Sequence, residues 1–351
     1  MNNAFIEYLN KFSEAEWLDA VETLLPSIHE VDRNATQIWF RFYPLELFRY
    51  LESAEDIDAA IAEIELQGDY RLADQIDTSH HFLYGHRYWP DVKAAIETET
   101  DAFSGGAANL SGEIAEIAKR ISEKLKVNVS LLTGITAVGL MTLVQSGIEA
   151  FKAAAGKVEK PHGLMTRSPG SIVSERAKDD SQGMLGFLKT INKKFSIIYD
   201  ETSGSGRFPV MNDQELTSAS AEDRSQNWQE RDRRCWNGVI PVECTAAACG
   251  TCWIGVIAGA EKLSDVARRE RRAMKVFGYE QPEDDRPILR LACQAKALGN
   301  ATIVIPPWNA NFGKTVYGNV EDIELDPVTT SAKRLRETLA SVGQGDAGES
   351  K

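Results

Sequence analysis

Residues 243–253 read ECTAAACGTCW and place three cysteines, Cys244, Cys249 and Cys252, close together. The chain of 351 residues has only five cysteines, and the other two are Cys235 and Cys293. The N-terminus shows no basic start followed by an apolar run, so a secreted disulfide framework is not indicated. In a reducing compartment, a cysteine cluster is more typical of metal binding or redox chemistry. We therefore expect a cytoplasmic protein with a metal or redox site.

The spacing of four of the cysteines narrows the chemistry. Cys244, Cys249, Cys252 and Cys293 follow the pattern C-x4-C-x2-C with a distant fourth cysteine. This pattern suits a cluster of two irons and two sulfides, because three thiolates come from one loop and the fourth from elsewhere in the fold. Small residues between the ligands let backbone N–H groups approach the sulfurs.

The same cysteines leave two other kinds of site as alternatives. A structural zinc site usually has two C-x2-C pairs, and this chain has one. A C-x2-C dithiol centre would leave Cys244 unexplained. Cys235 lies outside the pattern and is expected to be a buried, inert thiol.

Two segments resemble the 2Fe–2S ferredoxin family. They are IPVECTAAACGTCWIGV at 240–256 and RLACQ at 290–294. The resemblance implies a β-grasp domain over 191–310 that binds one 2Fe–2S cluster. Its implied iron ligands are Cys244, Cys249, Cys252 and Cys293. The spacing of the first three cysteines matches the plant-type branch, whereas the insert before RLACQ and the glutamine after its cysteine resemble the adrenodoxin-like branch.

The chain departs from the family pattern at two places. Ala247 occupies a position where many members have glycine. The acidic helix that adrenodoxin-like members present to their reductases is replaced by ARRERR at 267–272, which contains Arg268, Arg269, Arg271 and Arg272. If this surface docks a redox partner, the partner should be acidic.

The pattern of elements predicts an α+β fold. Strands are expected at 195–200 and 207–211 as a hairpin, at 252–259, in an extended run at 288–294 and at 301–308, with helices at 219–236 and 263–278. Further helices are predicted at 13–25, 53–66, 89–99 and 113–125, with Ser13 and Ser53 as N-caps and Pro90 in a first turn. The predicted divisions are an acidic α-helical domain at 1–110, an apolar helix and connector at 111–190, the β-grasp domain at 191–310 and a tail at 311–351.

Residues 127–148 contain no charged side chain. Such a run is long enough to cross a bilayer as a helix. However, it includes Asn128, Gln145 and several threonines and glycines, and lysines flank both sides. A buried or partner-packed helix is favoured, and membrane contact or a single membrane span is the alternative.

The N-terminal part holds two further groups of interest. The aromatic run IWFRFYPLELFRYL at 38–51 is expected to form core, with a partner or cofactor pocket as the alternative. His80, His81 and His86 fit no familiar metal-ligand spacing, so we expect structural or surface roles for them.

Charge and motifs limit the function. Residues 1–110 carry 21 acidic and 7 basic side chains, a net charge of −14 that disfavours nucleic-acid binding. The chain shows no glycine-rich dinucleotide fingerprint, and we predict no catalytic residue. The leading hypothesis is one-electron transfer by a dedicated carrier subunit rather than a stand-alone enzyme. Its expected partner is a redox protein or a larger, membrane-associated redox complex.

Two alternatives remain for the function. One is an interaction or assembly protein whose cluster is structural or sensory. The other is a redox-enzyme subunit whose helical part binds a ligand. The sequence names neither the electron donor nor the acceptor.

Overall fold

The computed structural model describes residues 3–103, 105, 109–178, 193–279 and 286–318. The α-helices of these residues are α1 (Ala4–Leu9), α2 (Glu14–Leu24), α3 (Glu30–Phe42), α4 (Leu45–Ser53), α5 (Ile57–Glu63), α6 (Trp89–Ala102), α7 (Leu110–Leu125), α8 (Ser130–Ala153), α9 (Pro169–Arg176), α10 (Leu216–Glu222), α11 (Trp228–Arg231) and α12 (Arg268–Phe277). The strands are β1 (Gln67–Gly68), β2 (Lys194–Ile198), β3 (Arg207–Met211), β4 (Trp253–Ala258), β5 (Leu289–Leu291), β6 (Ala301–Val304) and β7 (Trp308–Asn309).

The N-terminal helices begin where local side chains cap them. Ser13 and Glu16 form the predicted capping box at the start of α2. The predicted cap at Ser53 is wrong, because Ser53 ends α4 and its hydroxyl donates to the carbonyl oxygen of Tyr50. Asp56 caps α5 instead, since its carboxylate accepts from the backbone N–H groups of Asp58 and Ala59.

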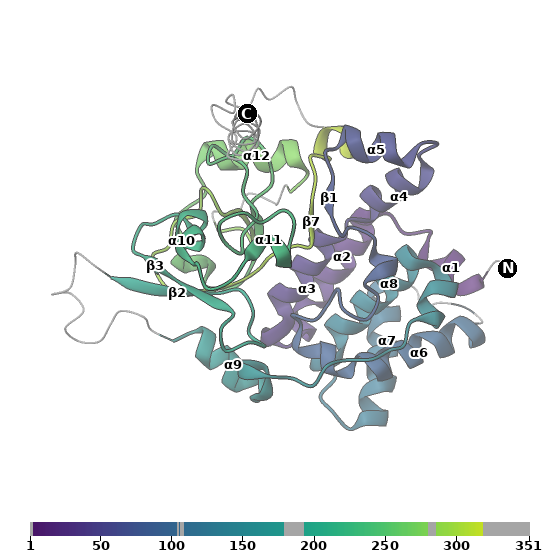
Figure 1. The fold of residues 1–351 in the computed structure, drawn as a ribbon. Coiled ribbons are helices and arrows are strands. Elements are labelled where there is room, and N and C mark those ends of the chain that lie inside the picture. Colours follow the sequence, from purple (N-terminus) through teal and green to yellow (C-terminus); the bar gives the residue numbers. More distant parts are fainter. Residues whose placement is uncertain (1–2, 104, 106–108, 179–192, 280–285, 319–351) are drawn as a thin grey trace, which may run out of the picture.

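Helix α8 is the central helix of the N-terminal part (Figure 1). Its most apolar window has a mean hydropathy of 1.6, which is enough for a membrane span by length and composition, but 78% of that window is buried inside the protein. Helices α3, α6 and α7 all pack against it. The apolar stretch is therefore accounted for as a core helix of this fold.

The C-terminal part is built on a mixed five-stranded sheet with the order β3-β2-β6-β4-β5. Strands β2 and β3 form the predicted antiparallel hairpin. Strand β6 then runs parallel to β2 and antiparallel to β4, and β5 is antiparallel to β4. Together with the N-terminal helices, this sheet confirms the predicted α+β class with a ferredoxin-like sheet in the C-terminal part.

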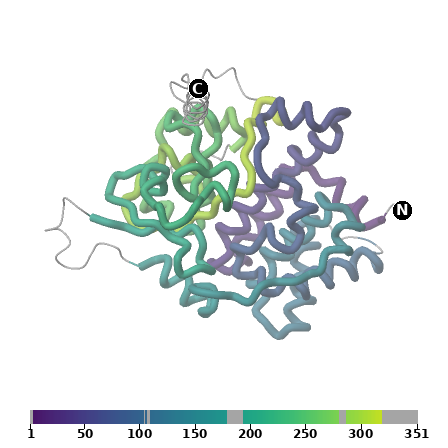
Figure 2. Tube along the Cα trace, viewed as in Figure 1, coloured from purple at the N-terminus to yellow at the C-terminus, as the bar shows by residue number. Residues whose placement is uncertain are grey.

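The helical and sheet-containing parts share one hydrophobic core, which extends from Phe5 to Phe312. Helix α3 lies against β4, and the side-chain amide of Asn34 donates to the carbonyl oxygen of Ile257 over 3.0 Å. Strands β1 and β7 form a two-stranded sheet in which Gly68 pairs with Trp308. The tube trace shows these early and late segments side by side (Figure 2). Residues far apart in the sequence therefore jointly position the C-terminal sheet.

Other predicted elements differ in extent. The helix expected over 219–236 is interrupted between α10 and α11, because the Asp223 carboxylate accepts from the backbone N–H of Ser225 and the Asp223 carbonyl accepts from the Trp228 indole. The expected connector contains the short helix α9. The tail predicted from residue 311 begins with a packed segment through Tyr317, and its part beyond residue 318 lies outside the described residues.

Candidate metal centre

The four patterned cysteines come from two segments that the sheet brings together. Cys252 directly precedes β4, and Cys293 follows β5. These strands are antiparallel, with Trp253 paired to Leu291, and the Ala292 N–H donates to the Cys252 carbonyl oxygen over 2.9 Å. Cys244 and Cys249 lie in the loop before β4. The strand pairing thus brings the distant Cys293 to the loop.

The thiols form two pairs. The side chain of Cys244 is hydrogen bonded to that of Cys249, and the side chain of Cys252 to that of Cys293. Among the described residues, no three His, Cys, Asp or Glu side chains are placed to surround one metal ion. Two thiols for each of two irons is the arrangement that a 2Fe–2S cluster needs, whereas a zinc site needs four ligands around one point.

Backbone N–H groups converge on the same sulfurs. The N–H of Ala248 donates to Cys244 Sγ over 3.4 Å, and the N–H of Ala247 points to the Cys293 sulfur. Ala247 adopts a positive φ of 53°, which L-residues reach only with strain. Glycine adopts a left-handed backbone without this strain, so the conformation of Ala247 is consistent with the glycine expected at this position from the family resemblance.

Gly250 gives the loop its second left-handed turn, with a φ of 66°. A Cβ at this position would lie 2.6 Å from Asn311 Oδ1 and 3.0 Å from the ring of Phe277. The loop can therefore pack against α12 only with glycine at this position.

The hydrogen bonds favour one thiolate in each pair. The Cys249 thiol, followed by backbone N–H groups, lowers the pKa of Cys244 to about 6. The Cys252 thiol likewise lowers the pKa of Cys293. The pKa values of Cys249 and Cys252 are raised, mainly because each is the donor in its pair and is then desolvated. A donor set that stabilises negative sulfur fits thiolate ligation of iron.

Two side-chain contacts around the loop were not predicted from the sequence. The amide of Gln294 donates to Cys293 Sγ over 3.4 Å and to the Thr245 carbonyl over 3.1 Å, so it connects the two cysteine segments. The buried Glu270 carboxylate pairs with Arg290 and also accepts from the Leu291 N–H. This pair fixes α12 to β5. In the sequence, this ion pair is indicated only by the single glutamate, Glu270, within the basic run ARRERR.

Cys235 is separate from this site. Its thiol donates to the Val239 carbonyl oxygen over 3.1 Å, and burial raises its pKa to about 12. It is thus a buried, protonated thiol, as the sequence suggested.

The three clustered histidines make their contacts within the helical part. His80 and His86 face each other with their Nδ1 atoms 2.8 Å apart, and His80 packs on Trp89. His81 Nδ1 lies 3.0 Å from the Thr78 carbonyl oxygen. Burial lowers the pKa of His86 to about 4 and lowers that of His80 well below its usual range. Both rings are therefore neutral packing groups at pH 7.

Comparison with known families identifies the segment that contains the four patterned cysteines. Residues 212–298 match the family described as 2Fe-2S iron-sulfur cluster binding domain. This segment is a 2Fe–2S cluster-binding domain. It includes Cys244, Cys249, Cys252 and Cys293, whereas the N-terminal half of the chain has no family match. No curated protein and no solved structure matches the chain.

Proposed function

We propose that this protein transfers single electrons through a 2Fe–2S cluster held by Cys244 and Cys249 on one iron and by Cys252 and Cys293 on the other. The pairing of the thiols is the observation that carries this assignment. When bound, the cluster supplies one-electron oxidation and reduction. The chain's own contribution is to orient the thiolates and to direct N–H groups toward their sulfurs.

The loop is close enough to the surface for a partner to approach it. Cys249 is only partly buried and Thr245 is exposed, whereas Cys244, Cys252 and Cys293 are buried. A partner that covers the exposed side of this loop would bring its own redox group near the iron ligands. We therefore place the electron-transfer contact at residues 245–249.

The charge next to this loop favours an acidic partner. Phe277 of α12 packs on Gly250, so α12 borders the loop, and Arg268, Arg269 and Lys275 of this helix are exposed. Positive charge beside a redox site accelerates encounter with a negatively charged partner. We propose a docking role for α12 within a larger redox complex.

The decisive experiment is a redox titration of the full chain purified without oxygen. We expect two irons and two sulfides per chain, a rhombic EPR signal after reduction, and full recovery of the oxidised absorbance on reoxidation. A cluster that degrades on reduction would contradict electron transfer and would favour the structural or sensory alternative. Stoichiometric zinc without iron would overturn the site itself.

A further inference from the structure

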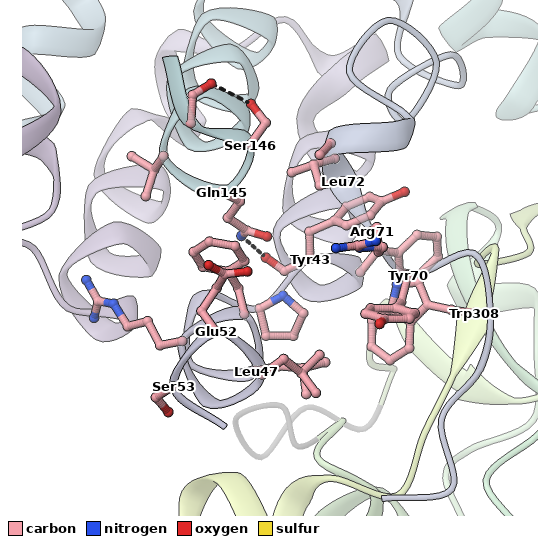
Figure 3. A pocket seen from close by; sticks show the side chains of 18 of the residues that line it. Tyr43, Leu47, Glu52, Ser53, Tyr70, Arg71, Leu72, Gln145, Ser146 and Trp308 are labelled. Atoms are coloured by element: carbon pink, nitrogen blue, oxygen red, sulfur yellow. Dashed lines mark hydrogen bonds between the residues drawn. The ribbon is translucent and has the colours of Figure 1, made fainter. Parts of the chain in front are cut away.

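A cavity of about 850 Å³ lies where the helical part meets β7. Its walls are mostly apolar and include side chains of α3, α4 and α5, the segment after β1, a break in α8, and Trp308 of β7 (Figure 3). Its volume is within the range of small-molecule and cofactor sites. The aromatic run at 38–51 was predicted to form core, with a pocket as the alternative. It does both, because Phe42 and Tyr43 belong to the hydrophobic core and also line this cavity, together with Phe48.

The cavity is connected to the metal centre through one residue. Trp253 directly follows Cys252 and contacts two residues of the cavity wall. Its ring centroid lies 5.0 Å from that of Phe42 and 5.5 Å from that of Trp308, both edge-on. A molecule in the cavity would therefore be separated from an iron ligand by two aromatic side chains.

Polar groups occur at both ends of the cavity. Figure 3 shows Tyr70 and Arg71 near Trp308 at one end. The Arg71 side chain has no ion pair or hydrogen bond among the described residues, so its donors are available to a ligand. At the other end lie Glu52 and Gln145, and the Gln145 amide donates to the Tyr43 carbonyl oxygen over 2.8 Å.

The backbone of α8 is broken at the cavity wall. Gly147 has φ 75° and ψ 160° within the helix, and a Cβ there would meet nothing within 4 Å. Packing therefore does not require glycine at this position, whereas the left-handed backbone does. Strained backbone of this kind is concentrated at ligand sites and other functional positions.

We propose that this cavity binds a quinone-type molecule: an apolar ring with carbonyl oxygens that accept hydrogen bonds from Arg71 and Tyr70. The apolar walls fit the ring, and the donors near Trp308 fit its oxygens. The choice of a redox-active class rests on the proposed electron-transfer function, because the wall of the cavity touches the residue after Cys252. A flavin nucleotide fits less well, since Arg71 and Arg49 are the cavity's two basic side chains and Arg49 is already paired with Glu46.

The test is calorimetric titration of the oxidised full chain with menadione, and separately with flavin mononucleotide. We expect saturable binding of one menadione per chain and weaker binding of the flavin. Arg71→Gln should weaken menadione binding about tenfold, the loss expected for a hydrogen bond from a charged donor. Ile57→Trp should also weaken it, because Ile57 lines the cavity yet is 37% exposed, so the larger ring can enter without disturbing the core.

The matched control is Arg207→Gln, which removes an exposed arginine on β3 away from the cavity and should leave the affinity unchanged. The proposal would be overturned if the chain did not bind menadione or if it bound the flavin more tightly. It would also be overturned if Arg71→Gln and Ile57→Trp bound menadione as tightly as the unmodified chain. Binding to the oxidised chain does not depend on turnover. A chain that binds menadione but cannot be reduced reversibly would contradict electron transfer and leave this site standing.

Discussion

Trp253 packs edge-on against Phe42, with ring centroids 5.0 Å apart, although 211 positions separate them in the sequence. Trp253 also stacks on Tyr279, with centroids 3.9 Å apart. The residue next to Cys252, a proposed iron ligand, is therefore held between the helical part and the segment after α12. The helical part thus packs directly against the residue that follows Cys252.

This contact predicts a stability effect at a distance from the cysteines. Phe42→Ala should lower the free energy of unfolding by about 3–5 kcal/mol, because it leaves a cavity under Trp253. The measurement is urea denaturation followed by fluorescence and by cluster absorbance, and both signals should shift together. Ile57→Ala, at a residue 37% exposed, should cost less than about 1 kcal/mol. Loss of helical structure without any change in the cluster signal would show that the two parts are not coupled.

Removal of single thiols tests the ligand assignment. Cys293→Ser should lose the cluster or hold it weakly, because the second iron would keep only Cys252 as a thiolate ligand. Cys235→Ser should retain two irons and two sulfides per chain, since Cys235 bonds to Val239 instead. Iron and sulfide analysis with EPR provides the measurement. An intact, tightly held cluster in Cys293→Ser would contradict the assignment of Cys293 as the fourth ligand. Loss of the cluster in Cys235→Ser would likewise contradict the assignment, because Cys235 is placed outside the site.

The left-handed conformation at residue 247 predicts a stabilising substitution. Ala247→Gly should raise the thermal midpoint of the holoprotein and slow cluster loss, because it relieves strain of up to about 1 kcal/mol. Ala246→Gly is the matched control. Ala246 has no positive φ, so glycine there should be neutral or destabilising by about 0.5–1 kcal/mol. Equal effects of the two substitutions would argue against strain at Ala247.

Charge on α12 should steer small oxidants. In the double variant Arg268→Glu with Arg269→Glu, oxidation of the reduced protein by ferricyanide should slow about tenfold at low salt, and oxidation by hexaammineruthenium should accelerate. Both effects should diminish at high salt because of screening. Stopped-flow absorbance is the measurement. Lys119→Glu with Lys126→Glu, on and just after α7, changes the net charge equally and should have little effect. A similar response in both double variants would indicate total charge rather than a docking face.

The paired histidines predict a pH dependence of stability. Because burial lowers the pKa of His86 to about 4 and also lowers that of His80, the folded state favours neutral rings. The contribution of the two neutral rings to the free energy of unfolding is complete above pH 6.5, near the pKa of histidine in the unfolded chain. It is lost as the pH falls toward about 4, by about 1.4 kcal/mol per pH unit for one such group.

The measurement is the urea midpoint between pH 7.5 and 5 for His86→Gln and for the exposed His162→Gln. His86→Gln should flatten the acid-side decline, whereas His162→Gln should leave it unchanged. Burial raises the pKa of Asp32 to about 6, so this carboxyl increases the free energy of unfolding as the pH falls below 6, opposite to the histidines. The comparison between variants removes its contribution. An unchanged slope in His86→Gln would assign the decline to other groups.

The cysteine pattern was sufficient to predict the type of metal centre. The spacing of Cys244, Cys249, Cys252 and Cys293 identifies the candidate ligands, since ligand spacing in a tight loop is a local property. Alternating and helical periodicity likewise predicted the hairpin, α2, α6 and α12, because burial of one face imposes a period on the sequence. The failed predictions, at Ser53 and over 219–236, were helix ends and a polar segment, where short side-chain bonds compete closely.

The surroundings of the cysteine loop, in contrast, depend on contacts made in the folded chain. The pairing of β1 with β7 and the contacts of Trp253 with Phe42 and Trp308 join segments that are distant in the sequence. No local pattern encodes such contacts, because they depend on which faces meet once the chain has collapsed. The same reason applies to the cavity: its wall is shared by residues from Ile6 to Trp308, and only the folded chain brings them together.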